Sequence, residues 1–390
     1  MVGTHEDGHS VSGNVAYSPM ASQFIFTVCQ VGAEPTLKKE ITRVHPELRF
    51  AFSRPGFVTF KSENPLEADF ELNSVFARAY GLSLGKSDLG TLETLVKDTA
   101  QVLQDYQKYN EKSGKLRLHI WERDQHKPGE EPKDFKPGAW KAAVFTKIKQ
   151  MPEYSELFAD GAEARPGEMV LDLVAVEEDQ IWAGAHIHTE FHPRWPGGAP
   201  PIALPPEAPS RAFLKLEEAL LWSEISVRPE DVAVEIGSAP GGASYALLKR
   251  GLNVVGIDPA EMDPRVLAFG EDRFFHMKQT IASTRREDLP DLVQWLLLDM
   301  NVAPSITLFQ VDRLQARMRS TLLGVLLTIK LNEWKTADEI PDMLAHIKAM
   351  GMEEVRATQL ATNKQEIFVY GLTRRGLGRK QSQFNQPRQK

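Results

Sequence analysis

Val232-Ala-Val-Glu-Ile-Gly-Ser-Ala-Pro-Gly-Gly-Ala243 is the most informative segment of this chain. Its apolar first half predicts a buried strand, and Gly237, Gly241 and Gly242 predict a tight turn that leads into a helix. Asp258 ends the next apolar segment. A bare glycine backbone, the N–H groups of a helix N-terminus and a nearby carboxylate together suit an adenosine-bearing cofactor, because the carboxylate can accept hydrogen bonds from both ribose hydroxyls.

The order of residues in this loop separates two classes of cofactor. A dinucleotide-binding loop has the form Gly-x-Gly-x-x-Gly, whereas this loop contains a proline and two adjacent glycines. We therefore expect S-adenosylmethionine (SAM), and a nucleotide-linked oxidoreductase on the same fold is the alternative. The loop residues expected to contact the cofactor are Gly237, Ser238, Ala239, Pro240, Gly241, Gly242 and Ala243.

Composition places the chain among ordinary globular proteins. It has 390 residues, of which 42% are hydrophobic and 25% charged, enough for about two or three domains. The single cysteine, Cys29, excludes an internal disulfide framework and fits a reducing compartment. The longest apolar run, 322–329, is far shorter than the roughly 20 residues that span a bilayer. We expect a cytoplasmic monomer without a membrane contact.

The hydrophobic pattern divides the chain into five segments. Residues 1–20 are polar and predicted to be disordered, and residues 193–209 are so rich in proline that they predict a semi-rigid linker. Between them, residues 21–192 are predicted to form an α+β region that opens with a ferredoxin-like strand, helix and strand. Residues 210–373 form the next domain and residues 374–390 a basic tail.

Individual elements follow from the same pattern. In the first region we expect strands at 24–31, 57–61 and 116–121, helices at 34–44 and 88–109, and a hairpin of 169–176 with 181–188. In the second we expect helices at 210–224, 243–250, 305–319 and 337–350 and strands at 232–237, 254–258, 273–277, 293–299, 323–330, 353–360 and 366–372. Apolar strands that alternate with helices predict an α/β, doubly wound, mainly parallel sheet, and the last two strands predict an antiparallel hairpin at its edge.

The C-terminal segment has the opposite charge to the chain as a whole. The formal net charge is −7, yet the segment from Arg374 to Lys390 has basic residues and no acidic one. It is either a solvated, disordered tail or an arm that contacts phosphates.

Polar residues end three otherwise apolar strands of the predicted sheet. These are Asp258, Asp299 and Lys330. In a doubly wound sheet, functional residues collect at the carboxyl ends of the strands. Each residue alone is explained by a charge that reaches solvent, but with the glycine loop the three together indicate a site.

These residues carry a resemblance to a known family. Ser210-Arg-Ala-Phe-Leu-Lys-Leu216, Gly237-Ser-Ala-Pro-Gly-Gly242, Asp299-Met300 and Lys330 resemble the FtsJ-like SAM-dependent RNA ribose 2′-O-methyltransferases. That family uses a Lys-Asp-Lys-Glu tetrad. By resemblance the catalytic residues here are Lys215, Asp299, Lys330 and Glu366.

The resemblance is strongest to bacterial members that act on 23S rRNA, on a cytidine, over about residues 193–372. Such proteins carry an N-terminal ferredoxin-like plus THUMP-type RNA-binding region, which residues 21–192 would supply. The partner implied is RNA. A THUMP-type RNA-binding or ribosome-assembly protein with a weak or inactive methyltransferase domain is the alternative.

The residue types suit this chemistry. Lys330 would be the general base, and we expect burial and the nearby Lys215 to lower its pKa. Asp299 would orient Lys330 and contact the SAM sulfonium, and Glu366 would position Lys215 or the ribose. No metal is required, because the remaining acceleration is alignment for in-line transfer.

Two positions depart from the family pattern. The family usually has a bulky aromatic residue just after the paired glycines, where this chain has Ala243. Many relatives also have an acidic residue after the third strand that contacts adenine, whereas here only Gln279 could hydrogen-bond to it.

Three histidines superficially suggest a metal site. His186, His188 and His192 are closely spaced, but they follow strand alternation and no fourth ligand lies nearby in the sequence. We therefore expect no metal.

Overall fold

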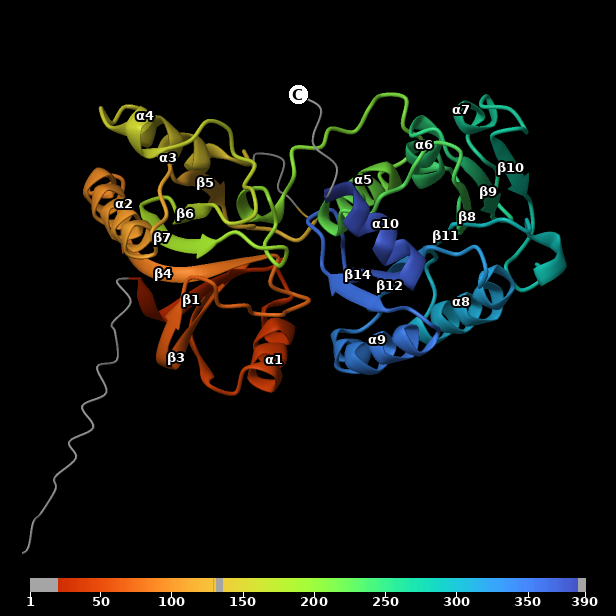
Figure 1. The fold of residues 1–390 in the computed structure, drawn as a ribbon, viewed down its shortest axis with the longest axis horizontal. Helices are drawn as coiled ribbons and strands as arrows, with labels where there is room; N and C mark the ends of the chain where they lie inside the picture. The colour runs from red at the N-terminus through yellow and green to blue at the C-terminus, as the bar shows by residue number, and fades with distance from the viewer. Residues whose placement is uncertain (1–19, 129, 131–135, 385–390) are drawn as a thin grey trace, which may run out of the picture.

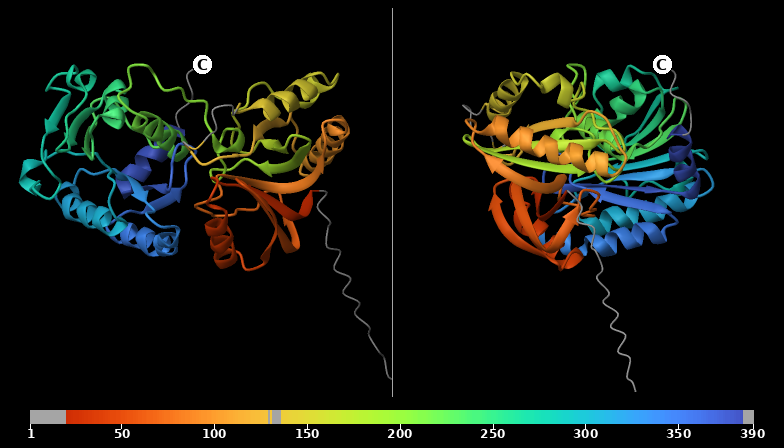
Figure 2. Two further views of the ribbon diagram at one scale, coloured as in Figure 1. Left: turned by 180° about the vertical axis from the view of Figure 1, so that it is seen from behind. Right: turned by 60° about the vertical axis from the view of Figure 1, so that its left-hand side comes forward.

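The computed structural model describes residues 20–128, 130 and 136–384, so the expected disorder of residues 1–19 lies outside it. Two α/β units lie side by side and are joined by one long connection (Figure 1). Seen from behind and from the side, each unit is built around its own sheet (Figure 2). In the described part of the chain, none of the helices combines the length and apolarity needed to cross a bilayer.

The N-terminal unit is one continuous seven-stranded sheet with helices packed against it. The strand order is β2-β3-β1-β4-β7-β6-β5. The strands are β1 (Ala21–Val28), β2 (Leu48–Arg54), β3 (Phe57–Glu67), β4 (Ala79–Ser87), β5 (Arg117–Glu122), β6 (Met169–Glu177) and β7 (Gln180–Ile187). The helices are α1 (Glu34–Val44), α2 (Leu92–Tyr109), α3 (Ala139–Lys149) and α4 (Tyr154–Leu157).

The ferredoxin-like prediction is correct for part of this unit. Strands β2, β3, β1 and β4 pair antiparallel in that order, as in a ferredoxin-like sheet. Residues 68–78 connect β3 to β4 without a helix, so the second crossover helix of that fold is missing. Strands β2 and β4 were not predicted from the sequence. The burial of β2 does not alternate cleanly, since Phe50 is exposed.

The C-terminal unit is a second seven-stranded sheet, ordered β10-β9-β8-β11-β12-β14-β13. Its strands are β8 (Val232–Ile236), β9 (Asn253–Ile257), β10 (Phe274–Met277), β11 (Trp295–Asp299), β12 (Gly324–Lys330), β13 (Glu354–Thr358) and β14 (Glu366–Leu372). Its α-helices are α5 (Ala212–Ser223), α6 (Gly242–Lys249), α7 (Pro264–Leu267), α8 (Pro304–Met318), α9 (Ile340–Ala349) and α10 (Arg374–Phe384). Short 3₁₀ turns are η1 (Pro196–Gly198), η2 (Arg286–Asp288) and η3 (Trp334–Glu339).

The topology of this second sheet confirms the doubly wound prediction. The five strands from β10 to β12 are parallel, and β14 pairs antiparallel with both β12 and β13. The chain moves outward from β8 through β9 to β10, then returns to β11 on the other side of β8. That reversal is the switch point where such sheets bind ligands, at the carboxyl ends of their strands.

Helices cover both faces of this sheet, which explains why its central strands are largely apolar. Leu296 and Leu298 of β11 pack with residues of α8 in one cluster, whereas Trp295 and Leu297 pack with residues of α5 and α6 in the other. A strand buried on both faces reads as a continuous apolar run.

The basic tail is not an extended arm over its described part. Residues 374–384 form α10, and Arg379 pairs with Asp231 at 2.5 Å. Lys380 pairs with Glu354 at 2.8 Å and contacts the hydroxyl of Tyr370. Residues 374–384 are therefore helical and held by ion pairs rather than disordered. Contact of the tail with phosphates stays a prediction, and residues 385–390 lie outside the described chain.

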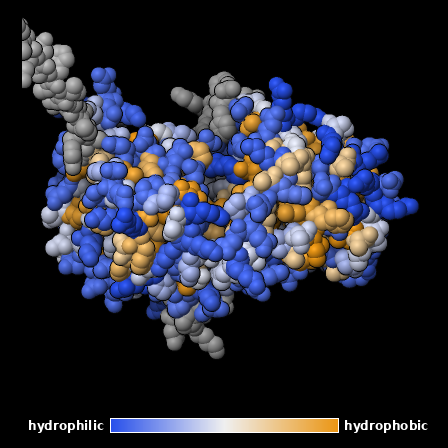
Figure 3. Space-filling model, turned by 90° about the horizontal axis from the view of Figure 1, so that it is seen from below, coloured by the Kyte–Doolittle hydropathy of each residue, from blue (hydrophilic) through white to orange (hydrophobic). Residues whose placement is uncertain are grey.

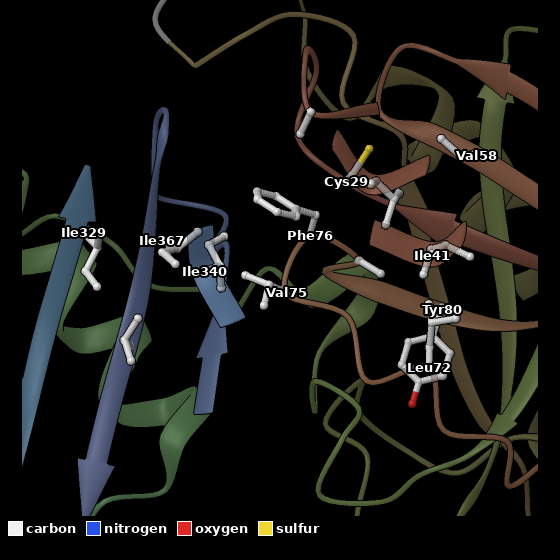
Figure 4. Close-up of a cluster of buried hydrophobic side chains, with 14 of the residues drawn as sticks. Cys29, Ile41, Val58, Leu72, Val75, Phe76, Tyr80, Ile329, Ile340 and Ile367 are labelled. Atoms are coloured by element: carbon white, nitrogen blue, oxygen red, sulfur yellow. The ribbon is translucent and has the colours of Figure 1, made fainter. Parts of the chain in front are cut away.

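The two units share a hydrophobic contact. Val75 and Phe76, on the β3–β4 connection, reach from the N-terminal unit toward Ile340 and Ile367 of the C-terminal unit (Figure 4). The ring of Phe76 also contacts Trp334 edge-on, with centroids 6.3 Å apart. The units therefore share part of their core.

On the outer surface seen from below, polar groups predominate and apolar patches lie over both units (Figure 3).

Candidate active site

Four charged side chains from three strands and one helix converge at the carboxyl edge of the second sheet. Asp299 is the last residue of β11 and Lys330 the last of β12. Glu366 opens β14 and stands directly opposite Lys330 in the antiparallel register. Lys215 projects from the first half of α5, which packs over this edge. All four residues of the predicted catalytic set are therefore neighbours.

The four groups form a closed ring of ion pairs. The Nζ atom of Lys215 lies 3.3 Å from Oδ2 of Asp299 and 2.6 Å from Oε1 of Glu366. The Nζ atom of Lys330 lies 3.1 Å from Oδ1 of Asp299 and also pairs with Oε2 of Glu366. Each carboxylate thus bridges both ammonium groups. The Glu366 side chain is 4% exposed, so it forms the floor of the ring, and the other three face outward.

The charge of Lys330 differs from the sequence prediction. Burial lowers its pKa, but Asp299 and Glu366 together outweigh burial and raise the pKa above its usual range. Burial likewise raises the pKa of Glu366, and Lys215 and Lys330 outweigh it and hold that pKa below its usual range. The prediction of a lowered Lys330 pKa is wrong, because it counted burial and the nearby cation and not the two carboxylates.

The glycine loop packs so tightly against neighbouring residues that a side chain at any of its three glycines would clash with them. Gly237 has φ +78°, and a Cβ there would lie 2.5 Å from the carbonyl oxygen of Asp299. Gly241 has φ +110° and is the N-cap of α6, without a side-chain cap. A Cβ on Gly242 would lie 2.3 Å from Oγ of Ser210. The loop therefore packs against the end of β11 and the start of α5, the two elements that carry Asp299 and Lys215.

Asp258 braces this loop from the end of β9. Its Oδ2 accepts a hydrogen bond from the Ala239 N–H at 3.1 Å, and its Oδ1 accepts one from the Ala260 N–H at 2.8 Å. The sequence predicts that Asp258 accepts hydrogen bonds from ribose hydroxyls. These hydroxyls would have to bind to the remaining lone pairs of the two Asp258 oxygens. Gln279 donates to Oγ1 of Thr284 at 3.0 Å, so its amide is held by a neighbour.

A cavity of about 400 Å³ lies between α5 and the sheet. Its walls include Lys215, Asp299 and Ala243, so it joins the charged ring to the start of α6. Asp258 and Gln279 are not among its lining residues. The small side chain of Ala243 helps to leave this space open.

Three polar residues near the ring were missed from the sequence. Glu218, one turn after Lys215, is 1% exposed and accepts hydrogen bonds from the N–H groups of Ala361 and Thr362. In the same loop, Asn363 donates to Oε1 of Glu366 at 3.3 Å. Helix α5 therefore positions the loop of residues 361–363 through Glu218, and this loop positions Glu366 through Asn363. The motif offered no signal for Glu218, because a glutamate next to another glutamate on an amphipathic helix reads as solvated.

The third missed residue is Glu235, within the opening motif itself. It is 3% exposed and accepts a hydrogen bond from Oγ of Ser244. Burial, with smaller contributions from Asp299 and Asp258, raises its pKa to about 8. The carboxyl of Glu235 is therefore neutral near pH 7, and it lines the cavity. Sequence reasoning missed this residue because it lies between apolar residues of one predicted strand.

A second cleft, of about 740 Å³, lies where the two units meet. The cations lining it are Arg78, Arg194, Arg356 and Lys380, and the acidic residues are Glu190, Glu218 and Glu224. It shares α5 and Leu360 with the first cavity. The two openings are therefore adjacent.

Comparison with known proteins agrees with this geometry. The family model for the FtsJ-like methyltransferases matches residues 208–336. Ribosomal RNA large subunit methyltransferase M of Azoarcus sp. (strain BH72) is 28% identical over 215 residues, which cover 53% of this chain and 57% of that protein. The protein of the same name from Halorhodospira halophila is 31% identical over 198 residues, which cover 47% of this chain and 54% of its own. The chain thus spans little more than half the length of the curated relatives it matches.

Solved structures are more distant. TrmN from Thermus thermophilus aligns over 90% of this chain and 99% of its own length, with 15% sequence identity and a TM-score of 0.31.

Proposed function

We propose that this chain, whose C-terminal region contains an FtsJ-like methyltransferase domain, transfers a methyl group from SAM to a ribose 2′-hydroxyl of large-subunit rRNA. The observation that carries the proposal is the convergence of Lys215, Asp299, Lys330 and Glu366 beside a glycine loop at the switch point of the sheet. The names of the matched relatives support rRNA as the substrate, and we extend the proposal to a cytidine of 23S rRNA.

The residues around the loop fit SAM. Gly237, Gly241 and Gly242 let the loop pack directly against its protein neighbours, where a Cβ would clash. The first turn of α6 would offer backbone N–H groups to the polar tail of the cofactor. Asp258 and Gln279 would take the ribose and adenine, and Asp299 would face the sulfonium. When bound, SAM supplies an electrophilic methyl group.

In this proposal Lys330 accepts the proton of the attacking hydroxyl, so it must first become neutral. Asp299 and Glu366 oppose that loss of charge in the cofactor-free chain, because they raise the pKa of Lys330. A sulfonium cation beside Asp299 would offset that carboxylate and lower the pKa again. Lys215, through its contacts with both carboxylates, keeps them in place as the proton moves, and alignment of the hydroxyl supplies most of the remaining acceleration.

Transfer of labelled methyl groups tests the function directly. The full chain is incubated with radiolabelled SAM and rRNA from cells that lack the protein, and the modified ribose is mapped. We expect incorporation at one 2′-hydroxyl by the wild type and none by Lys330→Ala, with the exposed Lys348→Ala on α9 as the matched control. Equal incorporation by Lys330→Ala would remove Lys330 as the base.

One observation favours a second candidate. Both oxygens of Asp258 already accept backbone hydrogen bonds, and a weak cofactor site would suit a THUMP-type RNA-binding or ribosome-assembly protein with an inactive domain. Calorimetric titration separates the two, because an inactive module would show no heat with SAM while it still bound rRNA. A parallel titration with NADH tests the oxidoreductase alternative.

A further inference from the structure

The N-terminal sheet contains a cluster of buried histidines that the methyl-transfer proposal does not use. His119 lies on β5, Asp172 on β6 and His186 on β7, three adjacent strands of the sheet. His119 is the direct partner of Asp172 across β5 and β6, and His186 is two residues from the partner of Asp172 across β6 and β7. Neighbours and diagonal neighbours on one face of a sheet touch, so the register itself brings the three together.

The distances within this cluster are those of a potential ligand set. The Nδ1 atom of His186 lies 2.7 Å from Oδ2 of Asp172, and the Nδ1 atom of His119 lies 3.6 Å from Oδ1. One ligand atom from each residue falls within 4.8 Å of the other two. Bonds of about 2.0–2.1 Å to a tetrahedral zinc hold ligand atoms roughly 3.3 Å apart. To form a coordination shell, the His186–Asp172 pair would have to open by about 0.6 Å, and pairs near the 4.8 Å limit would have to close by up to about 1.5 Å.

More imidazoles surround the same point. The ring of His192 stacks on that of His186, with centroids 4.3 Å apart, and the ring of His188 lies 6.2 Å from His186. Both come from the segment that follows β7 and leads into the proline-rich linker. Four histidines and one aspartate from four successive parts of the unit thus share one buried site.

Buried histidine nitrogens without a hydrogen-bond partner indicate that a group other than the protein binds in this cluster. Nε2 of His186, Nδ1 of His188 and Nε2 of His192 are buried and have no hydrogen-bond partner among the described residues. The five residues are at most 5% exposed. A buried polar atom without a partner costs about 1–3 kcal/mol, so three within one cluster would be expensive if nothing bound there.

The donor types also suit a cation, because imidazole nitrogen and carboxylate oxygen are ligands that zinc takes from histidine and aspartate. The group resembles sites in which a carboxylate and imidazoles select zinc or a similar divalent ion.

We propose that His119, Asp172 and His186 form a binding site for one divalent transition-metal ion, with Zn²⁺ as the reference ion. The ion would tie β5, β6 and β7 to one another, so its role is structural. Sequence spacing does not reveal this site, because Asp172 and His119 lie 14 and 67 residues before His186 in the chain, and only the sheet register brings them near.

Metal content and binding test the site without any reference to methyl transfer. The full chain, freed of metal by chelator and dialysis, is titrated with Zn²⁺ by calorimetry and with Co²⁺ by visible absorption. We expect about one ion per chain. Because Asp172→Asn and His186→Asn each remove one donor, affinity should fall at least about tenfold, and Zn²⁺ should raise the melting temperature of the wild type but not of these two variants.

Matched variants exclude other histidines. His346→Asn, exposed on α9, and the double variant His5→Ala/His9→Ala should bind as the wild type does. Unchanged affinity in both Asp172→Asn and His186→Asn would overturn the proposal, as would a wild type that binds no ion at micromolar concentration. If the variants do not fold, X-ray absorption of the Zn²⁺-loaded wild type decides: imidazole ligands support the site, and a shell of oxygen atoms alone refutes it.

Discussion

Replacing Lys330 with arginine separates the charge of this residue from its proposed role as a base. Arginine retains a cation that can pair with Asp299 and Glu366, so the ring keeps two positive and two negative groups. A neutral replacement would leave two carboxylates with one partner, which costs about 3–5 kcal/mol when an ion pair is buried. The guanidinium cannot lose its proton near neutral pH, so Lys330→Arg removes proton transfer and little else.

The expected loss follows from the size of general-base catalysis. Such groups contribute about 10²–10⁴-fold in rate, or about 3–5 kcal/mol of transition-state stabilisation. We therefore expect Lys330→Arg to lower kcat by that factor while its SAM affinity and melting temperature stay near those of the wild type. Single-turnover transfer of labelled methyl to rRNA measures the first quantity, and calorimetry and thermal melting measure the other two.

The pH profile gives a second readout of the same step. The pKa of Lys330 is raised in the cofactor-free chain, so the protonated form predominates at neutral pH and kcat/KM of the wild type should rise with pH across about pH 6–9. The Lys330→Arg profile should lack this rise, and Lys348→Arg should match the wild type. Retention of more than about one tenth of the wild-type rate by Lys330→Arg would refute proton transfer to this residue.

Three further predictions concern the residues that support the ring. Gly242→Ala would bring a Cβ within 2.3 Å of Oγ of Ser210. We therefore expect about 1–3 kcal/mol of destabilisation in urea unfolding and weaker SAM binding. An unchanged free energy of unfolding would mean that α5 moves away without cost. Glu218→Ala removes the acceptor for two backbone N–H groups, so kcat should fall with SAM affinity retained, and a variant of full activity would show that the loop needs no brace. The raised pKa of Glu235, about 8, means that the folded state holds a proton that the unfolded state loses near pH 4.5; stability should therefore decline by a few kcal/mol as pH rises from about 5 to 8. Denaturant unfolding of Glu235→Gln should show a smaller decline, and identical pH dependence in the two proteins would contradict the assignment.

The hydrophobic pattern was sufficient to predict the second sheet. Its strands are buried on both faces, and the predicted strands and helices of residues 210–373 all occur, within a few residues at their ends. The helix expected at 337–350 begins instead with the 3₁₀ turn η3. The first sheet was harder to predict. The edge strand β2 has an exposed Phe50 and no clean alternation of burial, and β4, which was also not predicted, pairs with β7 and so joins the ferredoxin-like part to the rest of the sheet.

The sequence determined the chemistry of the glycine loop, since a proline and paired glycines at 237–242 restrict what can approach the backbone. Asp299 and Lys330 could be selected from their positions at strand ends, whereas Lys215 and Glu366 were selected only through the resemblance to the FtsJ-like family. Only the tertiary structure decided the charge state of Lys330, since its pKa depends on two carboxylates that are 31 and 36 residues away in the chain. The same holds for Glu218, Glu235 and the cluster around Asp172: electrostatics and coordination depend on distance in space, which sequence spacing does not report.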